Sequence, residues 1–173
     1  MAHNLPDTIP ADFMAAIAYL DTKDKLGLDE MKLLVLLETS GEPLYQKLAS
    51  LAPEGEATEL LLMNGREETA HARRLKRAIE IATGESFELP SLDENPYAEP
   101  PPFTELTPEL LAGFVAGEKN GDAGYQKWAD NEPKPEIAEL LRQNGREETR
   151  HGERVERVAG ILAGGALLAE PGV

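Results

Sequence analysis

One segment of this sequence occurs twice, with the two copies 80 residues apart. The sequence Asn-Gly-Arg-Glu-Glu-Thr, followed after one further residue by histidine, spans residues 64–71 and again residues 144–151. At the same offset a glutamate recurs as Glu38 and Glu118, and Tyr-Gln-Lys recurs at residues 45–47 and 125–127. A single offset that relates such separated blocks is typical of a duplicated structural unit. We therefore expect two helical hairpins of similar build.

The composition favours a folded, acidic protein. The chain of 173 residues is 41% hydrophobic and 28% charged, which is enough to bury a core, and we expect one domain over residues 1–173. Its net charge of −15 argues against a nucleic-acid partner, because phosphate backbones need a basic surface. The absence of cysteine excludes disulfides, thiolate metal sites and iron–sulfur clusters. No apolar run is long enough for a membrane span and no signal-peptide pattern opens the chain, so we expect a cytoplasmic protein without a membrane partner.

Apolar periodicity predicts a short helix over residues 11–20, after a loose arm in which His3 is solvated. The first hairpin, residues 28–83, has a helix capped by Asp29 that kinks or breaks between Thr39 and Pro43, because proline lacks the N–H that continues a helix.

Its second helix is expected over residues 56–83, with Gly84 at the carboxyl end. The second hairpin, residues 107–162, begins with Thr107 as cap and Pro108 in the first turn. Its helices end near Asp130 and near residue 162, where Gly-Gly at 164–165 and Pro171 close a short tail.

Residues 84–106 connect the hairpins and contain five prolines without a helical period, which predicts an extended crossover. For equivalent side chains to meet at one level, this crossover has to span about 34 Å, the length of a helix. An extended segment of this size reaches about 70 Å, so the connection is long enough. The slack also permits the crossover to be swapped between two chains.

The repeated residues have the spacing of metal ligands. Glu68 and His71 lie three residues apart, on one face of a helix, and the same holds for Glu148 and His151. Glu38 lies about 21 Å before the turn of its hairpin and Glu68 about 18 Å after it, so the two meet at one level. Glu118 and Glu148 give the same result in the second hairpin.

Four carboxylates at the centre of a helical bundle repel one another, and each costs several kcal/mol to remove from water. Two divalent cations would offset that charge. Oxygen ligands with imidazole and no thiolate suit iron, with manganese or zinc as alternatives.

This pattern resembles the ferritin-like superfamily, and within it the rubrerythrin group, over about residues 28–162. The resemblance implies an all-α, ferritin-like four-helix bundle of two hairpins joined by a long crossover, with a short N-terminal helix and two iron ions. It implies the following ligands: Glu38 and Glu118 as terminal carboxylates, Glu68 and Glu148 as bridging carboxylates, and His71 and His151 as the imidazole of each metal.

The resemblance implies a non-haem di-iron oxidoreductase that reduces hydrogen peroxide or O2. Because the sequence has no cysteine, electrons are expected from a separate donor, and we expect a homodimer. A ferroxidase for iron storage and a non-catalytic, metal-stabilised helical module are the alternatives. Rubrerythrins place a further glutamate at the position of Gly121, where the nearest acid here is Asp122, with Glu42 equivalent in the first half. Bacterioferritin has a similar ligand set, but the tail after residue 162 is too short for its fifth helix.

Several neighbours of the ligands could support them. Tyr45 and Tyr125 lie on the ligand face and are expected as core aromatics, with hydrogen bonds to the ligands or electron transfer as alternatives. Asn64 and Asn144 are candidates to hydrogen-bond the ligands.

Glu67 and Glu147 lie about 100° round the helix from the bridging carboxylates, and we expect them at the surface. Glu67→Ala should then be nearly silent. Gly41 and Gly121 could leave space for an oxygen species or allow close helix packing.

Overall fold

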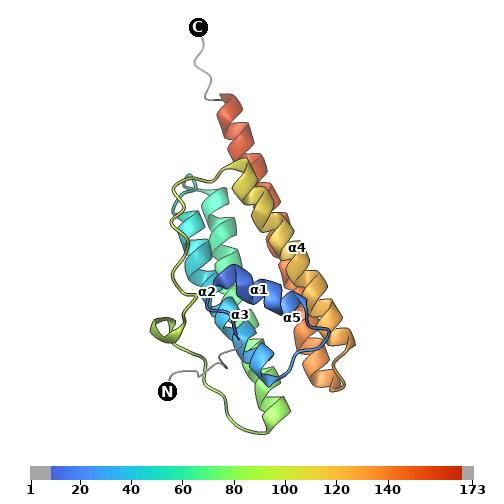
Figure 1. The fold of residues 1–173 in the computed structure, drawn as a ribbon. Helices are drawn as coiled ribbons and strands as arrows, with labels where there is room; N and C mark the ends of the chain where they lie inside the picture. The colour runs from blue at the N-terminus through green and yellow to red at the C-terminus, as the bar shows by residue number, and fades with distance from the viewer. Residues whose placement is uncertain (1–8, 169–173) are drawn as a thin grey trace.

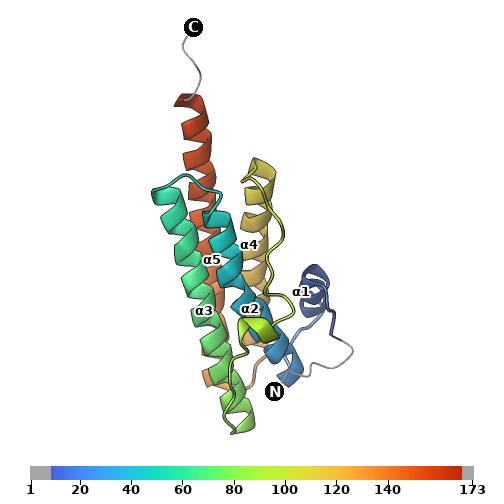
Figure 2. The ribbon, with the colours of Figure 1, turned by 90° about the vertical axis from the view of Figure 1, so that its left-hand side faces the viewer.

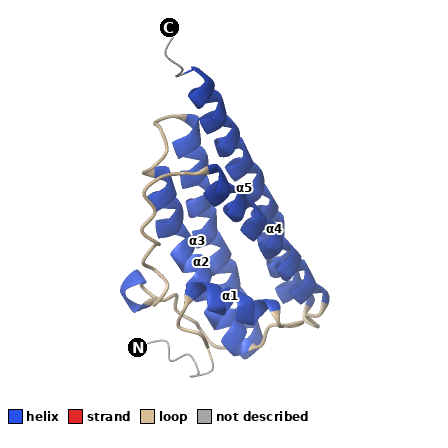
Figure 3. Cartoon of the chain, turned by 45° about the horizontal axis from the view of Figure 1, so that its top comes forward, coloured by secondary structure: helices blue, strands red, loops and turns tan. Residues whose placement is uncertain are grey.

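The computed structural model describes residues 9–168, with the side chains of residues 9–164, and this part of the chain contains helices and loops without a strand (Figure 3). His3, with residues 1–8 of the expected arm, lies outside the described residues, and so does Pro171. In chain order the elements are α1 (Phe13–Asp21), α2 (Leu28–Ala49), α3 (Glu56–Thr83), the 3-10 helix η1 (Leu92–Glu94), α4 (Pro108–Asp130) and α5 (Pro135–Leu168).

Four of these helices form the bundle that the sequence predicts. α2 packs antiparallel to α3 and α4 packs antiparallel to α5, while α3 and α5 form the main contact between the hairpins (Figures 1 and 2). The crossover runs beside α2 along the bundle, so that α4 starts at the end opposite to where α3 finishes (Figure 1). The long crossover is therefore confirmed, with η1 as its one helical turn.

Local capping chemistry fixes the ends of the helices. Thr107 accepts a hydrogen bond from the backbone N–H of Leu110 at 3.1 Å, and Pro108 occupies the first turn, where no N–H is needed. Gly84 ends α3 in the left-handed region, at φ 76°, which glycine adopts without a steric cost. Both ends match the sequence prediction.

Two details of α2 differ from the prediction. Its cap is Gly27, whose N–H donates to the carboxylate of Glu30 at 3.0 Å, and Asp29 lies inside the first turn. Of the kink or break expected at Pro43, the break is wrong, because α2 is continuous to Ala49. The turn before the proline is packed firmly against the bundle, and Thr39 donates its hydroxyl to the carbonyl of Val35 at 2.9 Å. Tertiary packing thus outweighs the missing hydrogen bond.

The end of α5 was also predicted wrongly. The helix continues through the Gly-Gly pair at 164–165 to Leu168, beyond the start of α4 (Figure 1). Each glycine costs about 1 kcal/mol relative to alanine in a helix. An existing helix adds residues without a new nucleation step, so two glycines do not end it.

Two apolar clusters fill the bundle, one on each side of its middle. The first joins α1 and the crossover to the bundle through residues that include Leu20, Leu33, Leu37, Leu75, Tyr97, Trp128 and Leu141. The second, at the opposite end, includes Tyr45, Leu48, Leu61, Leu111, Val155 and Val158. The segments between these clusters carry the repeated acids and histidines.

Polar contacts fasten the outer elements to the first cluster. The indole N–H of Trp128 donates to the carbonyl of Lys23 at 2.9 Å, which ties the segment after α1 to α4. Asn95 of the crossover donates to the carbonyl of Leu36 at 2.7 Å, and the Tyr97 hydroxyl donates to the carbonyl of Pro10. Among the described residues, no helix combines the length and the apolar composition needed to cross a bilayer.

Gly41 of α2 lies directly against the Glu68 side chain of α3, and a mutation can test this close contact. A Cβ atom at Gly41 would lie 2.5 Å from Cγ of Glu68, close to that residue's own backbone, where a side chain cannot easily move. We expect Gly41→Ala to lower the free energy of unfolding of the metal-free protein by about 1–3 kcal/mol. Urea denaturation followed by circular dichroism measures this change.

Gly121→Ala is the matched control in the second half. Its Cβ would lie 3.4 Å from Cγ of Glu148, an ordinary contact, so alanine should be neutral or stabilise the helix by up to about 1 kcal/mol. Equal effects of the two substitutions would contradict the close-packing role of Gly41.

Candidate metal centre

Six side chains from α2, α3, α4 and α5 meet in the middle of the bundle, and we call them the Glu/His cluster. They form two overlapping groups, within each of which one potential ligand atom per residue lies within 4.8 Å of the others. The first group is Glu38, Glu68, His71 and Glu148, and the second is Glu68, Glu118, Glu148 and His151. Glu68 and Glu148 belong to both groups, which is where the sequence analysis places the bridging carboxylates.

The Nδ1 atoms of the two histidines face the carboxylates. Nδ1 of His71 lies 3.2 Å from Glu38 and 3.2 Å from Glu148. Nδ1 of His151 lies 3.2 Å from Glu68 and 3.5 Å from Glu148. The two imidazole rings stack with centroids 5.2 Å apart. Nδ1 of each ring therefore faces carboxylates of its own group, including Glu148, which both groups share.

Burial gives this cluster unusual protonation behaviour when no metal balances its charge. Burial, reinforced by the charge of Glu148, raises the pKa of Glu118 to about 8, and the same causes raise the pKa of Glu68 well above its ordinary value. Burial alone would also raise the pKa of Glu148, but the neighbouring His151 and His71 outweigh it and lower that pKa. Burial would lower the pKa of His71, but hydrogen bonds to Glu147 and two other carboxylates raise it to about 12. Without metal, protons thus take the place of cations.

The donor set fits two divalent metal ions. Nδ1 of His151 is a buried nitrogen without a hydrogen-bond partner in the described part of the chain, and buried polar atoms are rarely left so. A metal ion beside the carboxylates would give it a partner. Two divalent ions would also balance the four carboxylate charges of the cluster. Carboxylate and imidazole donors without a thiolate suit iron or manganese.

Glu67 and Glu147 are not surface acids, so that prediction is wrong, and the reason for expecting a silent Glu67→Ala no longer holds. Glu147 is buried, and its carboxylate accepts from Nε2 of His71 at 3.1 Å. Glu67 is half-buried and accepts from Nε2 of His151 at 3.0 Å. Each acid thus holds the histidine of the other half.

An arginine completes each of these contacts. Arg74 donates to both oxygens of Glu147, at 2.7 and 3.0 Å, and Arg154 donates to both oxygens of Glu67, at 2.8 and 3.0 Å. The 100° rotation that turns Glu67 away from its own ligand face turns it toward α5. The sequence did hold a signal, because an arginine follows each histidine by three residues at the same 80-residue offset.

The protonation of these acids decides which histidine nitrogen faces the metals. A hydrogen bond from His151 and the charge of Arg154 lower the pKa of Glu67 to about 2, although burial opposes the shift. Burial would raise the pKa of Glu147, but His71 and Arg74 lower it to about 2. Both acids are therefore ionised and can only accept hydrogen bonds. On metal binding, Nε2 of each ring would keep the proton that its acid accepts, and Nδ1 would lose its proton and offer a lone pair to the cluster.

The tyrosines connect the halves in the same reciprocal manner. Tyr45 donates its hydroxyl to Glu118, and Tyr125 donates its hydroxyl to Glu38. Burial, followed by the charge of the carboxylate partner, raises the pKa of each tyrosine well above its ordinary value, so both stay protonated donors. The alternative of hydrogen bonds to the candidate ligands is thus confirmed, and the description as plain core aromatics was incomplete.

The asparagines also contact the opposite half. Asn64 donates to the backbone carbonyl of His151 at 3.2 Å, and Asn144 donates to that of His71 at 3.4 Å. Asn144 also donates to the hydroxyl of Tyr125 at 3.2 Å.

The acids nearest to the missing rubrerythrin-type glutamate do not replace it. Asp122 accepts from the hydroxyl of Thr149 at 2.6 Å, and Glu42 accepts from that of Thr69 at 2.7 Å. Both contacts join the two helices of one hairpin and lie outside the two ligand groups. Neither of these two acids therefore takes the place of a glutamate at the position of Gly121.

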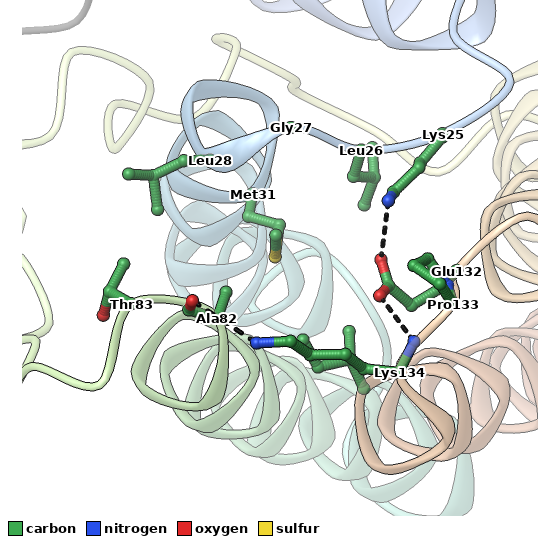
Figure 4. Close-up of a pocket in the computed structure, with 11 residues that line it drawn as sticks. Lys25, Leu26, Gly27, Leu28, Met31, Ala82, Thr83, Glu132, Pro133 and Lys134 are labelled. Atoms are coloured by element: carbon green, nitrogen blue, oxygen red, sulfur yellow. Dashed lines mark hydrogen bonds and ion pairs between the residues drawn. The ribbon is translucent and has the colours of Figure 1, made fainter.

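A separate pocket of about 430 Å³ lies at the end of the bundle, between the start of α2, the end of α3 and the turn before α5 (Figure 4). Its charged side chains have partners within the protein. Lys25 lies 3.7 Å from Glu132, and Lys134 donates from Nζ to the carbonyl of Ile81 at 2.9 Å. These contacts cap the helix ends, and we assign no ligand to this pocket.

Comparison with known proteins points to one family. The family model described as Rubrerythrin matches residues 35–159, which is more than half of the chain. The matched span runs from α2 into α5 and contains the whole Glu/His cluster. The comparisons with curated proteins and with solved structures gave no match.

The pKa shifts predict how the stability of the metal-free protein depends on pH. Because the folded pKa of Glu118 is about 8 and its ordinary value is 4.5, the folded state holds a proton that the unfolded state releases between these values. His71, with its pKa raised from 6.5 to about 12, acts in the same direction above pH 6.5. Stability therefore falls as pH rises through this window, whereas Glu67 and Glu147 titrate only below it.

Thermal unfolding at about pH 5.5, 7 and 8.5, with and without bound metal, tests this prediction. The gain in Tm on metal binding should increase with pH, because the metal replaces the missing protons. In the metal-free form, Glu118→Gln should flatten the fall in Tm. A metal-free protein whose Tm rises from pH 5.5 to 8.5 would contradict the prediction.

Proposed function

The chain belongs to the rubrerythrin family, and we propose that it is a non-haem di-iron oxidoreductase that reduces hydrogen peroxide or O2. The observation that carries the proposal is the pair of overlapping ligand groups that share Glu68 and Glu148. Two carboxylates common to both groups suit a pair of metals that act together.

In this proposal Glu38 and His71 would hold one iron, Glu118 and His151 would hold the other, and Glu68 and Glu148 would be available to both. Two bound ferrous ions would supply the two electrons that, with two protons, convert hydrogen peroxide into two molecules of water. Manganese or zinc fits the ligand types, but zinc cannot supply electrons because it has no redox chemistry.

The other residues of the site would prepare the ligands for this chemistry. Tyr45 and Tyr125 each fix one oxygen of a terminal carboxylate, while its other oxygen faces Nδ1 of the histidine in the same group. The apolar clusters on both sides keep bulk water away from the centre, which strengthens the electrostatic interactions inside it.

The electrons that restore the ferrous state would come from a separate donor protein or reductant. The sequence has no cysteine, so it cannot hold a thiolate-bound iron centre of its own. We further propose a homodimer as the working assembly.

One observation favours a second candidate, a ferroxidase. Gly121 stands where rubrerythrins have an additional glutamate, and no nearby acid takes its place. The same six ligands could then hold ferrous iron while O2 oxidises it for storage. The relative rates with the two oxidants and the size of the assembly separate these functions.

The test is anaerobic loading with Fe(II), followed by stopped-flow mixing with hydrogen peroxide or with O2 and absorbance detection of oxidation. We expect two irons per chain and a faster reaction with peroxide. Glu68→Ala and Glu148→Ala should each slow oxidation more than about 100-fold, beyond the effect of removing an outer partner of a metal site.

Arg146→Ala is the control, because Arg146 makes an exposed ion pair with Glu139 and should leave the rate unchanged. A faster reaction with O2, together with a cage-sized assembly on size exclusion, would favour the ferroxidase. Bound iron that reacts with neither oxidant would refute both enzymes and indicate a metal-stabilised helical module.

A further inference from the structure

The two halves of the centre have the same ligands but different support. The carboxylate of Glu147 contacts His71, Arg74 and also Arg150, which lies 3.1 Å from Oε1. At the equivalent position of the first repeat the residue is Ala70, so Glu67 has no counterpart of Arg150. The side chain of Glu147 is accordingly 10% exposed and that of Glu67 27%.

We propose that Glu147 with Arg74, and Glu67 with Arg154, are positioning residues for the two histidines, and that Arg150 makes the His71 half the tighter metal site. The proposal rests on the proposed function only in that the cluster binds two metal ions.

The physical reason lies in how a histidine presents Nδ1. An imidazole can rotate about its side-chain bonds, and the hydrogen bond from Nε2 to a fixed carboxylate selects the rotation that directs Nδ1 at the cluster. The paired contacts of an arginine fix the plane of that carboxylate, because the guanidinium is rigid and bidentate. A histidine whose carboxylate partner is already fixed loses less conformational entropy when it binds the metal.

Arg150 adds a third contact to the carboxylate of Glu147, and Glu67 has no equivalent contact. It lies one turn after Glu147 on α5, where residues three apart are neighbours on the helix surface. Its own side chain is 50% exposed, so it can be replaced without opening the core. Within the described part of the chain, the carboxylate of Glu67 contacts His151 and Arg154 and is more open to water than that of Glu147. Water competes for its hydrogen bonds, which leaves the ring of His151 less firmly held.

The test is titration of the metal-free protein with Co(II) under anaerobic conditions, followed by the d–d absorption of the bound ion and by competition with a chelator. The wild type should bind two Co(II) in two resolvable steps. His71→Ala should remove the tighter step, which assigns it. Glu147→Gln should weaken the tighter step about 10–100-fold, and Glu67→Gln should weaken the second step by a similar factor.

Exchange of the asymmetric position provides matched variants. Arg150→Ala should bring the tighter step closer to the second one, and Arg150→Lys should retain part of the difference because one charge contact remains. Ala70→Arg should increase the affinity of the second step and so also reduce the difference in affinity between the two steps. Circular dichroism and the Tm of each metal-free variant establish that the fold is retained.

The outcomes separate this inference from the proposed function. A wild type that binds no Co(II) and no Fe(II) would refute the proposed function itself. A wild type that binds two ions while Glu147→Gln and Glu67→Gln leave both steps unchanged would overturn the positioning role alone. Two bound ions with an unchanged difference in Arg150→Ala and Ala70→Arg would overturn the role of Arg150.

Discussion

Four carboxylates buried in the middle of a helical bundle are the constraint on which the rest of this structure depends. Ionised acids at this depth cost several kcal/mol each unless a positive charge accompanies them. The two acid–arginine pairs beside the cluster are neutral among themselves, so they leave the charge of the four central acids untouched. Protons can balance that charge in part, as the raised pKa of Glu118 shows, and two divalent ions can balance it completely.

The polar centre is also what makes the two hairpins one unit. The acid beside each bridging carboxylate holds the opposite histidine, and each tyrosine holds the opposite terminal acid. Each asparagine likewise donates a hydrogen bond to the backbone carbonyl of the histidine in the opposite hairpin. Neither hairpin contains a complete ligand set with its supports, so a chain that carries both hairpins needs the long crossover that brings α4 to the correct end.

Much of this arrangement was predictable, because it depends on spacing along single helices. The height of Glu38 and Glu68 in their hairpin and the face shared by Glu68 and His71 follow from helix geometry, and Thr107 and Gly84 signal helix ends by local chemistry. The errors arose where a neighbouring element decides the outcome. Pro43 sits in a turn that packing holds together, and Glu67 points away from its own hairpin but toward α5. The role of Glu67 depends on how α3 packs against α5. The periodicity of one repeat carries no information about that packing.

The reciprocal contacts have a consequence for how such a centre can change over time. Two identical copies of one hairpin, related by a two-fold axis, could make every one of these exchanges, since in a symmetric pair each contact is made twice. In that arrangement any substitution would appear on both sides at once. Joining the hairpins in one chain removes this restriction. Ala70 and Arg150 occupy equivalent positions and differ, as do the surroundings of Gly41 and Gly121. A single chain can therefore evolve its two metal positions toward different tasks while both keep the same ligands.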